Sequence, residues 1–101
     1  MNKMINIATD YTRYPGPRYA NDGPFSGEVF RDTILMDALK QAIATGGVVT
    51  VSLDGVAGYG SSFLEEAFGG LLRKGFTSDT LDRHLRVIAH TGRFQHHARA
   101  A

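Results

Sequence analysis

The feature that most constrains the fold of this chain is an abrupt change in the spacing of apolar residues near position 60. Residues 48–53 form a short, β-branched apolar run between two glycine-containing turns, which is typical of a central strand covered on both faces. After Gly60 the apolar residues recur at helical spacing, at Phe63, Leu64, Ala67, Phe68, Leu71 and Leu72. The sequence therefore predicts a buried strand, a glycine-rich turn and an amphipathic helix.

Two serines stand where this helix is expected to begin. Ser62 occupies the expected N-cap position, and Glu65 follows at the spacing of a capping box, in which the hydroxyl accepts a bond from a backbone N–H and the carboxylate reaches back. With Ser61 beside it, the turn places two hydroxyls at the electropositive end of a helix.

The remaining elements follow from the same patterns. We expect a first strand over residues 4–8, an irregular loop from Tyr11 to Gly27 that contains all three prolines, a helix over 27–45 capped by Ser26, a helix from Ser62 to Arg73 or Lys74, a short helix over 78–84 capped by Ser78, and a last strand over 85–89. On the first helix, Arg31 is expected to face solvent. This order predicts a small α/β domain: a central, mostly parallel sheet of about four strands, packed by two main helices and a short third helix.

Composition limits the function classes. A chain of 101 residues with 43% hydrophobic and 21% charged content matches a single domain, residues 1–101, in which we expect 91–101 to be a loosely ordered tail. The net charge of +1 gives no support for nucleic-acid binding, and no apolar run approaches the length of a membrane span or a signal core, so we expect a cytoplasmic protein. Cysteine is absent, and no cofactor is implied.

Two stretches carry a family resemblance, Arg13-Tyr14-Pro15-Gly16-Pro17-Arg18-Tyr19 and Asp54-Gly55-Val56-Ala57-Gly58-Tyr59-Gly60-Ser61-Ser62-Phe63-Leu64. They resemble the STAS-like family of small bacterial and phage-associated proteins, which is related to the STAS domains of anti-sigma factor antagonists. The resemblance implies a non-enzymatic regulatory module that binds a protein partner, such as a GHKL-type ATPase or an anti-sigma-like protein. It also implies a phosphorylation switch, with Ser62 first and Ser61 second. The chain departs from the STAS signature at Gly60, in place of an acidic residue, and at Phe63, in place of a glycine.

Each part of the predicted surface has an alternative interpretation. Instead of being a phosphorylation site, Ser62 can simply cap the helix. The turn from Gly58 to Ser62 can also bind a nucleotide or anion, as in a small-ligand sensor. The Gly69-Gly70 pair can allow tight packing on the sheet or the first helix, or present a flat surface to a partner or a second copy. Arg13, Tyr14, Arg18 and Tyr19 can bind phosphate, nucleic acid or a peptide. Alternatively, the aromatic residues Tyr11, Tyr14, Tyr19 and Phe25 can pack the loop over one end of the sheet, with the arginines paired to Asp10 or Asp22.

Catalysis is not expected. The residues around Ser62 lack the final glycine of the G-x-S-x-G nucleophile elbow, and no pair of residues is marked out to activate and orient a base. The histidines at 90, 96 and 97 are expected to be solvated rather than metal-bound. We therefore predict no catalytic and no metal site, and a binding surface made by Gly58, Tyr59, Gly60, Glu65, Glu66, Gly69 and Gly70 together with the loop residues Arg13, Tyr14, Arg18 and Tyr19.

Overall fold

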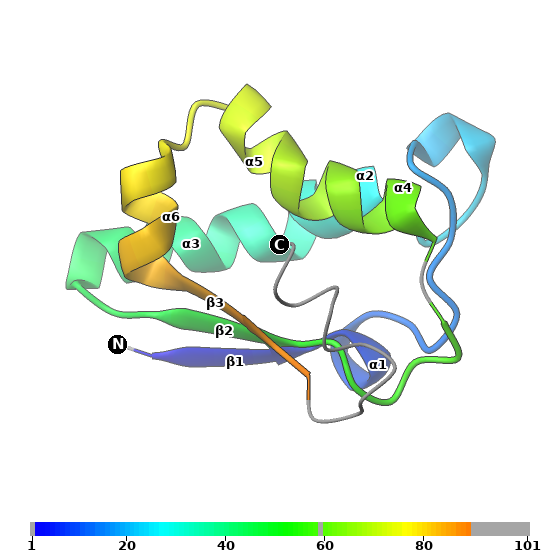
Figure 1. Ribbon diagram of the computed structural model, residues 1–101, viewed down its shortest axis with the longest axis horizontal. Helices are drawn as coiled ribbons and strands as arrows, with labels where there is room; N and C mark the ends of the chain where they lie inside the picture. The colour runs from blue at the N-terminus through cyan, green and yellow to red at the C-terminus, as the bar shows by residue number, and fades with distance from the viewer. Residues whose placement is uncertain (1, 59, 90–101) are drawn as a thin grey trace.

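A three-stranded parallel sheet forms one layer of the structure, and helices form the other (Figure 1). The computed structural model describes residues 2–58 and 60–89, and contains strands β1 (Lys3–Asn6), β2 (Val49–Ser52) and β3 (Leu85–Ile88) in the order β1-β2-β3. The apolar run 48–53 thus supplies the central strand, as predicted. The expected number of about four strands is not confirmed, because three are present among the described residues.

The helices of the α/β arrangement lie on one side of this sheet. Ile5, Val51 and Val87 stand in register across the three strands, and Ile5 and Val51 are buried beneath the helices. Their neighbours Met4 and Arg86 point to the opposite face and are exposed. Among the described residues, helices therefore cover one face of β2 rather than both (Figure 1).

The helical coil predicted over residues 27–45 is observed as three consecutive segments: α2 (Gly27–Phe30), the π-helical η2 (Arg31–Leu35) and α3 (Met36–Thr45). Ser26 caps it as expected, because its hydroxyl accepts the Val29 N–H at 3.1 Å. Gly46 ends it in the left-handed conformation, with φ of 74°.

The second coil has the same construction, with α4 (Ser61–Leu64), the π-helical η3 (Glu65–Gly69) and α5 (Gly70–Arg73). Its predicted C-terminus at Arg73 is confirmed, but its predicted capping box is wrong. Gly60 is the N-cap residue and makes no side-chain cap bond, so Ser61 and Ser62 are the first two residues of the helix. Glu65 does not reach back to the cap because its carboxylate accepts hydrogen bonds from Arg18 and Arg73 instead.

Two other boundaries differ from expectation. The first strand ends at Asn6, and residues 7–10 form the short helix α1 (Ile7–Asp10), because the Asp10 carboxylate accepts the Asn6 N–H at 2.7 Å and closes a turn there. The last helix, α6 (Ser78–His84), is capped by Thr77 and not by Ser78, since the Thr77 hydroxyl accepts the Thr80 N–H at 3.1 Å.

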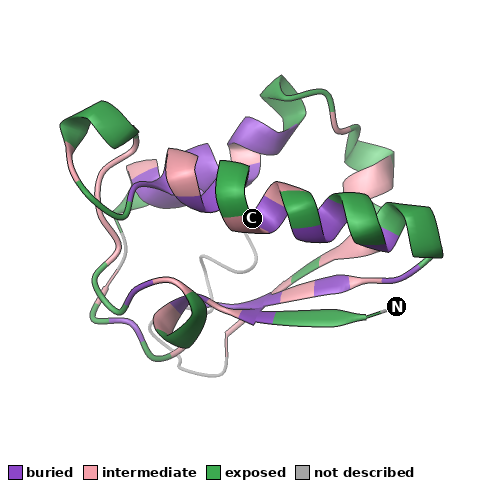
Figure 2. Ribbon diagram, turned by 180° about the vertical axis from the view of Figure 1, so that it is seen from behind, coloured by how far each residue is buried: buried purple, intermediate pink, exposed green. Residues whose placement is uncertain are grey.

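The core lies between the helices and the sheet, and the outward faces of the helices are exposed (Figure 2). Phe30 and Phe63 are fully buried with ring centroids 6.2 Å apart, so the first turns of the two coils meet through aromatic contact. Within the part of the chain that the structure describes, no helix has the length and apolar character to cross a membrane. The tail expected over residues 91–101 lies outside the described residues.

Candidate functional site

The junction between β2 and α4 presents its serines at the surface. Gly55 takes a φ of 90° in the turn that follows the strand, a conformation that favours glycine over residues with a side chain. The chain then reaches α4, where Ser61 is exposed and Ser62 is half-buried. Both serines thus stand at the start of a helical coil, and Tyr59 lies outside the described residues.

The long loop of residues 11–26 is fastened beside this turn by backbone hydrogen bonds. The Ala57 N–H donates to the Arg13 carbonyl at 2.8 Å, which ties the loop to the glycine turn. The N–H groups of Gly27 and Glu28 donate to the carbonyls of Pro17 and Arg18 at 2.9 and 3.0 Å. These bonds satisfy amides that the first turn of a helix leaves unpaired, so the loop is held by the helix that follows it.

The aromatic residues of the loop divide between packing and exposure. Tyr11 packs edge-on against Phe25 and against Phe30, and its hydroxyl donates to the Ser26 carbonyl at 2.9 Å. Tyr14 is 74% exposed, and Tyr19 is also exposed. The packing interpretation therefore holds for Tyr11, whereas Tyr14 and Tyr19 remain available at the surface.

An ion cluster joins this loop to both helical coils. We define it as Arg18 from the loop, Arg31 from η2, Glu65 and Glu66 from η3, and Arg73 from α5. Arg18 bonds to Glu65 and lies 3.2 Å from the Glu66 carboxylate. Arg73 lies 2.9 Å from an oxygen of each glutamate.

The inner part of the cluster is deeply buried. Arg31 is 2% exposed and Glu66 is 5% exposed, and the two are ion-paired. The Arg31 guanidinium also donates to the Glu66 backbone carbonyl at 3.1 Å and to the Asp32 carboxylate at 2.8 Å. Arg31 thus binds one π-helical segment to the other through both a side chain and the backbone.

The arginines hold both glutamates in the charged form. Hydrogen bonds from Arg73 and then Arg18 lower the pKa of Glu65 from 4.5 to about 2. Burial acts to raise the pKa of Glu66, but bonds from Arg31 and Arg18 outweigh it, and the net shift is downward. Hydrogen bonds to Glu65 raise the pKa of both Arg18 and Arg73, so all members of the cluster remain ionised at neutral pH.

Gly69 and Gly70 make room for this cluster. A Cβ on Gly69 would overlap the Glu65 carboxylate, and a Cβ on Gly70 would overlap the Arg31 guanidinium. The tight-packing interpretation of this pair therefore holds for Gly70, which is buried against a side chain of the first coil. Gly69 instead leaves space for a carboxylate on its own coil.

Sequence patterns missed two members of the cluster. Arg31 was expected in solvent, and this prediction is wrong: it lies four and seven residues before the buried Leu35 and Ala38, on the apolar face of the helix, where Glu66 pairs with it. Arg73 was assigned only to the C-terminal end of its helix. Two signals in the sequence point to the cluster: the helical spacing of Arg31 with Leu35 and Ala38, and the Gly69-Gly70 pair within a helix, which indicates that something large lies close to the backbone.

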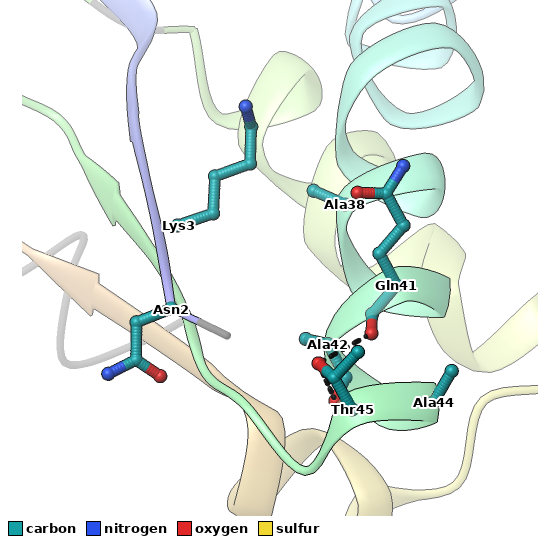
Figure 3. A pocket seen from close by; sticks show the side chains of 7 residues that line it. All are labelled: Asn2, Lys3, Ala38, Gln41, Ala42, Ala44 and Thr45. Atoms are coloured by element: carbon teal, nitrogen blue, oxygen red, sulfur yellow. Dashed lines mark hydrogen bonds between the residues drawn. The ribbon is translucent and has the colours of Figure 1, made fainter.

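Other candidate features lie apart from the serines. A groove of about 380 Å³ runs between β1 and α3 and is lined by Asn2, Lys3, Ala38, Gln41, Ala42, Ala44 and Thr45 (Figure 3). Its lining includes none of the described residues of the turn, which are Gly58 and 60–62. His84 Nδ1 bonds to the Gly47 carbonyl at 2.7 Å, at the amino end of β2, whereas the serines follow its carboxyl end. The histidines at 90, 96 and 97 lie outside the described residues.

The comparison with known families agrees with this architecture. The sequence profile of a family described as a STAS-like domain of unknown function matches residues 26–91, more than half of the chain. The chain belongs to this STAS-like family. The match includes both helical coils, the serine pair and β3, but it begins after the loop that contains Arg13 and Arg18. No curated protein and no solved structure matches the chain.

Proposed function

We propose that this STAS-like domain is a non-enzymatic regulatory module that binds a protein partner through the face formed by the loop 13–19, the turn before α4 and the second helical coil. The observation that carries the proposal is the serine pair at the start of that coil, with Ser61 exposed and Ser62 half-buried, within a chain that belongs to the STAS-like family. By the family resemblance, the partner is a GHKL-type ATPase or an anti-sigma-like protein in the cytoplasm.

Phosphorylation of Ser62 is proposed as the switch of this surface, with Ser61 as the second candidate. In such a step the γ-phosphorus of a nucleoside triphosphate forms a bond to the serine Oγ, its bond to the β,γ-bridging oxygen breaks, and the nucleoside diphosphate leaves while the hydroxyl proton passes to a base of the kinase. The added charge would alter the surface that the partner contacts.

The ion cluster supports a phosphate at this position. Glu65 and Glu66 lie three and four residues after Ser62, on the same side of the helix, and two free carboxylates there would repel a phosphate. Both carboxylates are instead bound by Arg18 and Arg73, and Glu66 is also bound by Arg31. Because Asp32 also pairs with Arg31, three cations face three anions, and the cluster presents no net negative charge to a phosphate.

The test is an intact-mass measurement on the tagged full chain isolated from its native host, with and without phosphatase treatment. We expect the mass of one phosphate group on the wild type and on Ser61→Ala, and its loss in Ser62→Ala. Isolation of the wild type without phosphate, and without a stoichiometric protein partner under any growth condition, would refute the proposal.

A further inference from the structure

Glu65 and Glu66 are adjacent and share two arginines, but different contacts hold them. Glu66 is buried and is bound from the core side by Arg31. The Glu65 side chain is 46% exposed, and its bonds within the described structure go to Arg18 and Arg73 at the surface. Glu65 is therefore the outer anion of the cluster and Glu66 the inner one.

The charges of the cluster show what Glu65 contributes. Arg31 is balanced without it, because its guanidinium contacts both Glu66 and Asp32. Arg18 reaches the Glu65 carboxylate from the loop, and Arg73 reaches it from α5. Their side chains are 30% and 54% exposed. Two guanidinium groups from different parts of the chain thus converge on one position at the surface, and Glu65 fills it.

Exchange of this carboxylate for another is inexpensive. Exposed ion pairs contribute little to stability, because water solvates the separated charges almost as well. An arginine fork binds any carboxylate with the same geometry, so an incoming acid can replace every bond that Glu65 gives up. Arg18 is further positioned by Tyr19, whose ring centroid lies 6.0 Å from the guanidinium carbon.

From this geometry we propose that Arg18 and Arg73 form a carboxylate-recognition site that Glu65 occupies in the free chain and yields to an acidic side chain of the partner protein. The proposal rests on the proposed function, since it assigns a chemistry to that partner: an aspartate or glutamate that docks beside the exposed Tyr14 and Tyr19. Glu65 is then an internal competitor that lowers the affinity of the free surface.

The proposal is tested with a fluorescein-labelled hexaglutamate peptide, with hexaglutamine as the neutral control, by fluorescence anisotropy on the full chain at low salt. The matched variant of Glu65→Gln is Asp79→Asn, which removes the same charge from an exposed pair with Arg83 on α6 at 3.0 Å. We expect Glu65→Gln to bind hexaglutamate about threefold to fivefold more tightly than either the wild type or Asp79→Asn, since an internal competitor has been removed. Adding Arg73→Gln should abolish the gain.

Equal affinities of Glu65→Gln and Asp79→Asn would overturn the proposal, as would a gain that survives Arg73→Gln. Tighter binding of inorganic phosphate than of hexaglutamate would assign the site to phosphate and overturn it as well. A measurement on the wild type guards against misfolded variants: the Arg73 Nε–Hε resonance should shift saturably with hexaglutamate while that of Arg83 does not. The peptide needs no phosphate and no native partner, so its failure would leave the test of the proposed function unaffected.

Discussion

Glu65 and Glu66 carry the same side chain and pair with the same two arginines but differ in burial, so comparing their substitutions measures how burial changes the stability contribution of an ion pair. Glu65→Gln and Glu66→Gln each remove one negative charge from the same two arginines. Removing one partner of a buried ion pair costs about 3–5 kcal/mol, and we expect about 3 kcal/mol for Glu66→Gln, because Arg31 keeps Asp32 and the amide still offers an acceptor. Loss of a half-exposed pair should cost less than about 1 kcal/mol for Glu65→Gln.

Urea unfolding at pH 7, followed by circular dichroism, measures both values. A domain of this size is stable by about 5–15 kcal/mol, and its unfolding free energy falls by about 1–3 kcal/mol per molar urea, so Glu66→Gln should lower the midpoint by roughly 1–3 M. Equal midpoint shifts for the two variants would refute the reasoning that burial sets the energy of this cluster. The double variant Arg31→Met/Glu66→Leu serves as the control, and should recover most of the loss because no charge is left buried without a partner.

Three further predictions follow from other contacts. Ser26→Ala should lower the free energy of unfolding in urea by about 1 kcal/mol, because the Ser26 hydroxyl caps α2. Ser62→Ala should change it by less than about 0.5 kcal/mol, since Ser62 does not cap α4. The reverse order would contradict the assigned caps. Gly70→Ala should destabilise the fold by about 1–3 kcal/mol, because the methyl group must displace the Arg31 guanidinium, and an unchanged thermal midpoint would show that the space is larger than described. The pKa of Glu65 is lowered from 4.5 to about 2, so its contribution is present above pH 4.5 and is lost as the pH falls toward 2; urea midpoints of the wild type and Glu65→Gln should therefore converge across that range, and a constant difference would refute the assigned pKa.

Local patterns predicted most of the secondary structure. The apolar run that became β2, the stop at Gly46 and the cap at Ser26 each depend on residues adjacent in the chain, so the sequence sufficed to place them. The errors arose where a neighbouring side chain offered an alternative bond. Asp10 ends the first strand early, and Thr77 replaces the expected cap of α6.

The serine junction could be located from the sequence, whereas the ion cluster could not. Ser61 and Ser62 were located from the sequence because the change from strand-like to helical spacing marks the start of a helix wherever it occurs. Arg31 was assigned to solvent, although helical spacing puts it on the same face as Leu35 and Ala38. Only the tertiary structure supplies Glu66, the buried partner that allows a charged residue to lie there.

The sequence by itself determined that this chain forms a small α/β domain with a strand, a glycine turn and a serine-led helical coil, because hydrophobic periodicity and turn residues act over short distances. Only the tertiary structure decided that Glu65 and Glu66 are neutralised. The cations that pair with them come from residue 18, residue 31 and residue 73, and only the packing of the loop and the two coils brings these positions together. Electrostatic energies depend on distance and burial in space, and neither can be read from separations along the chain.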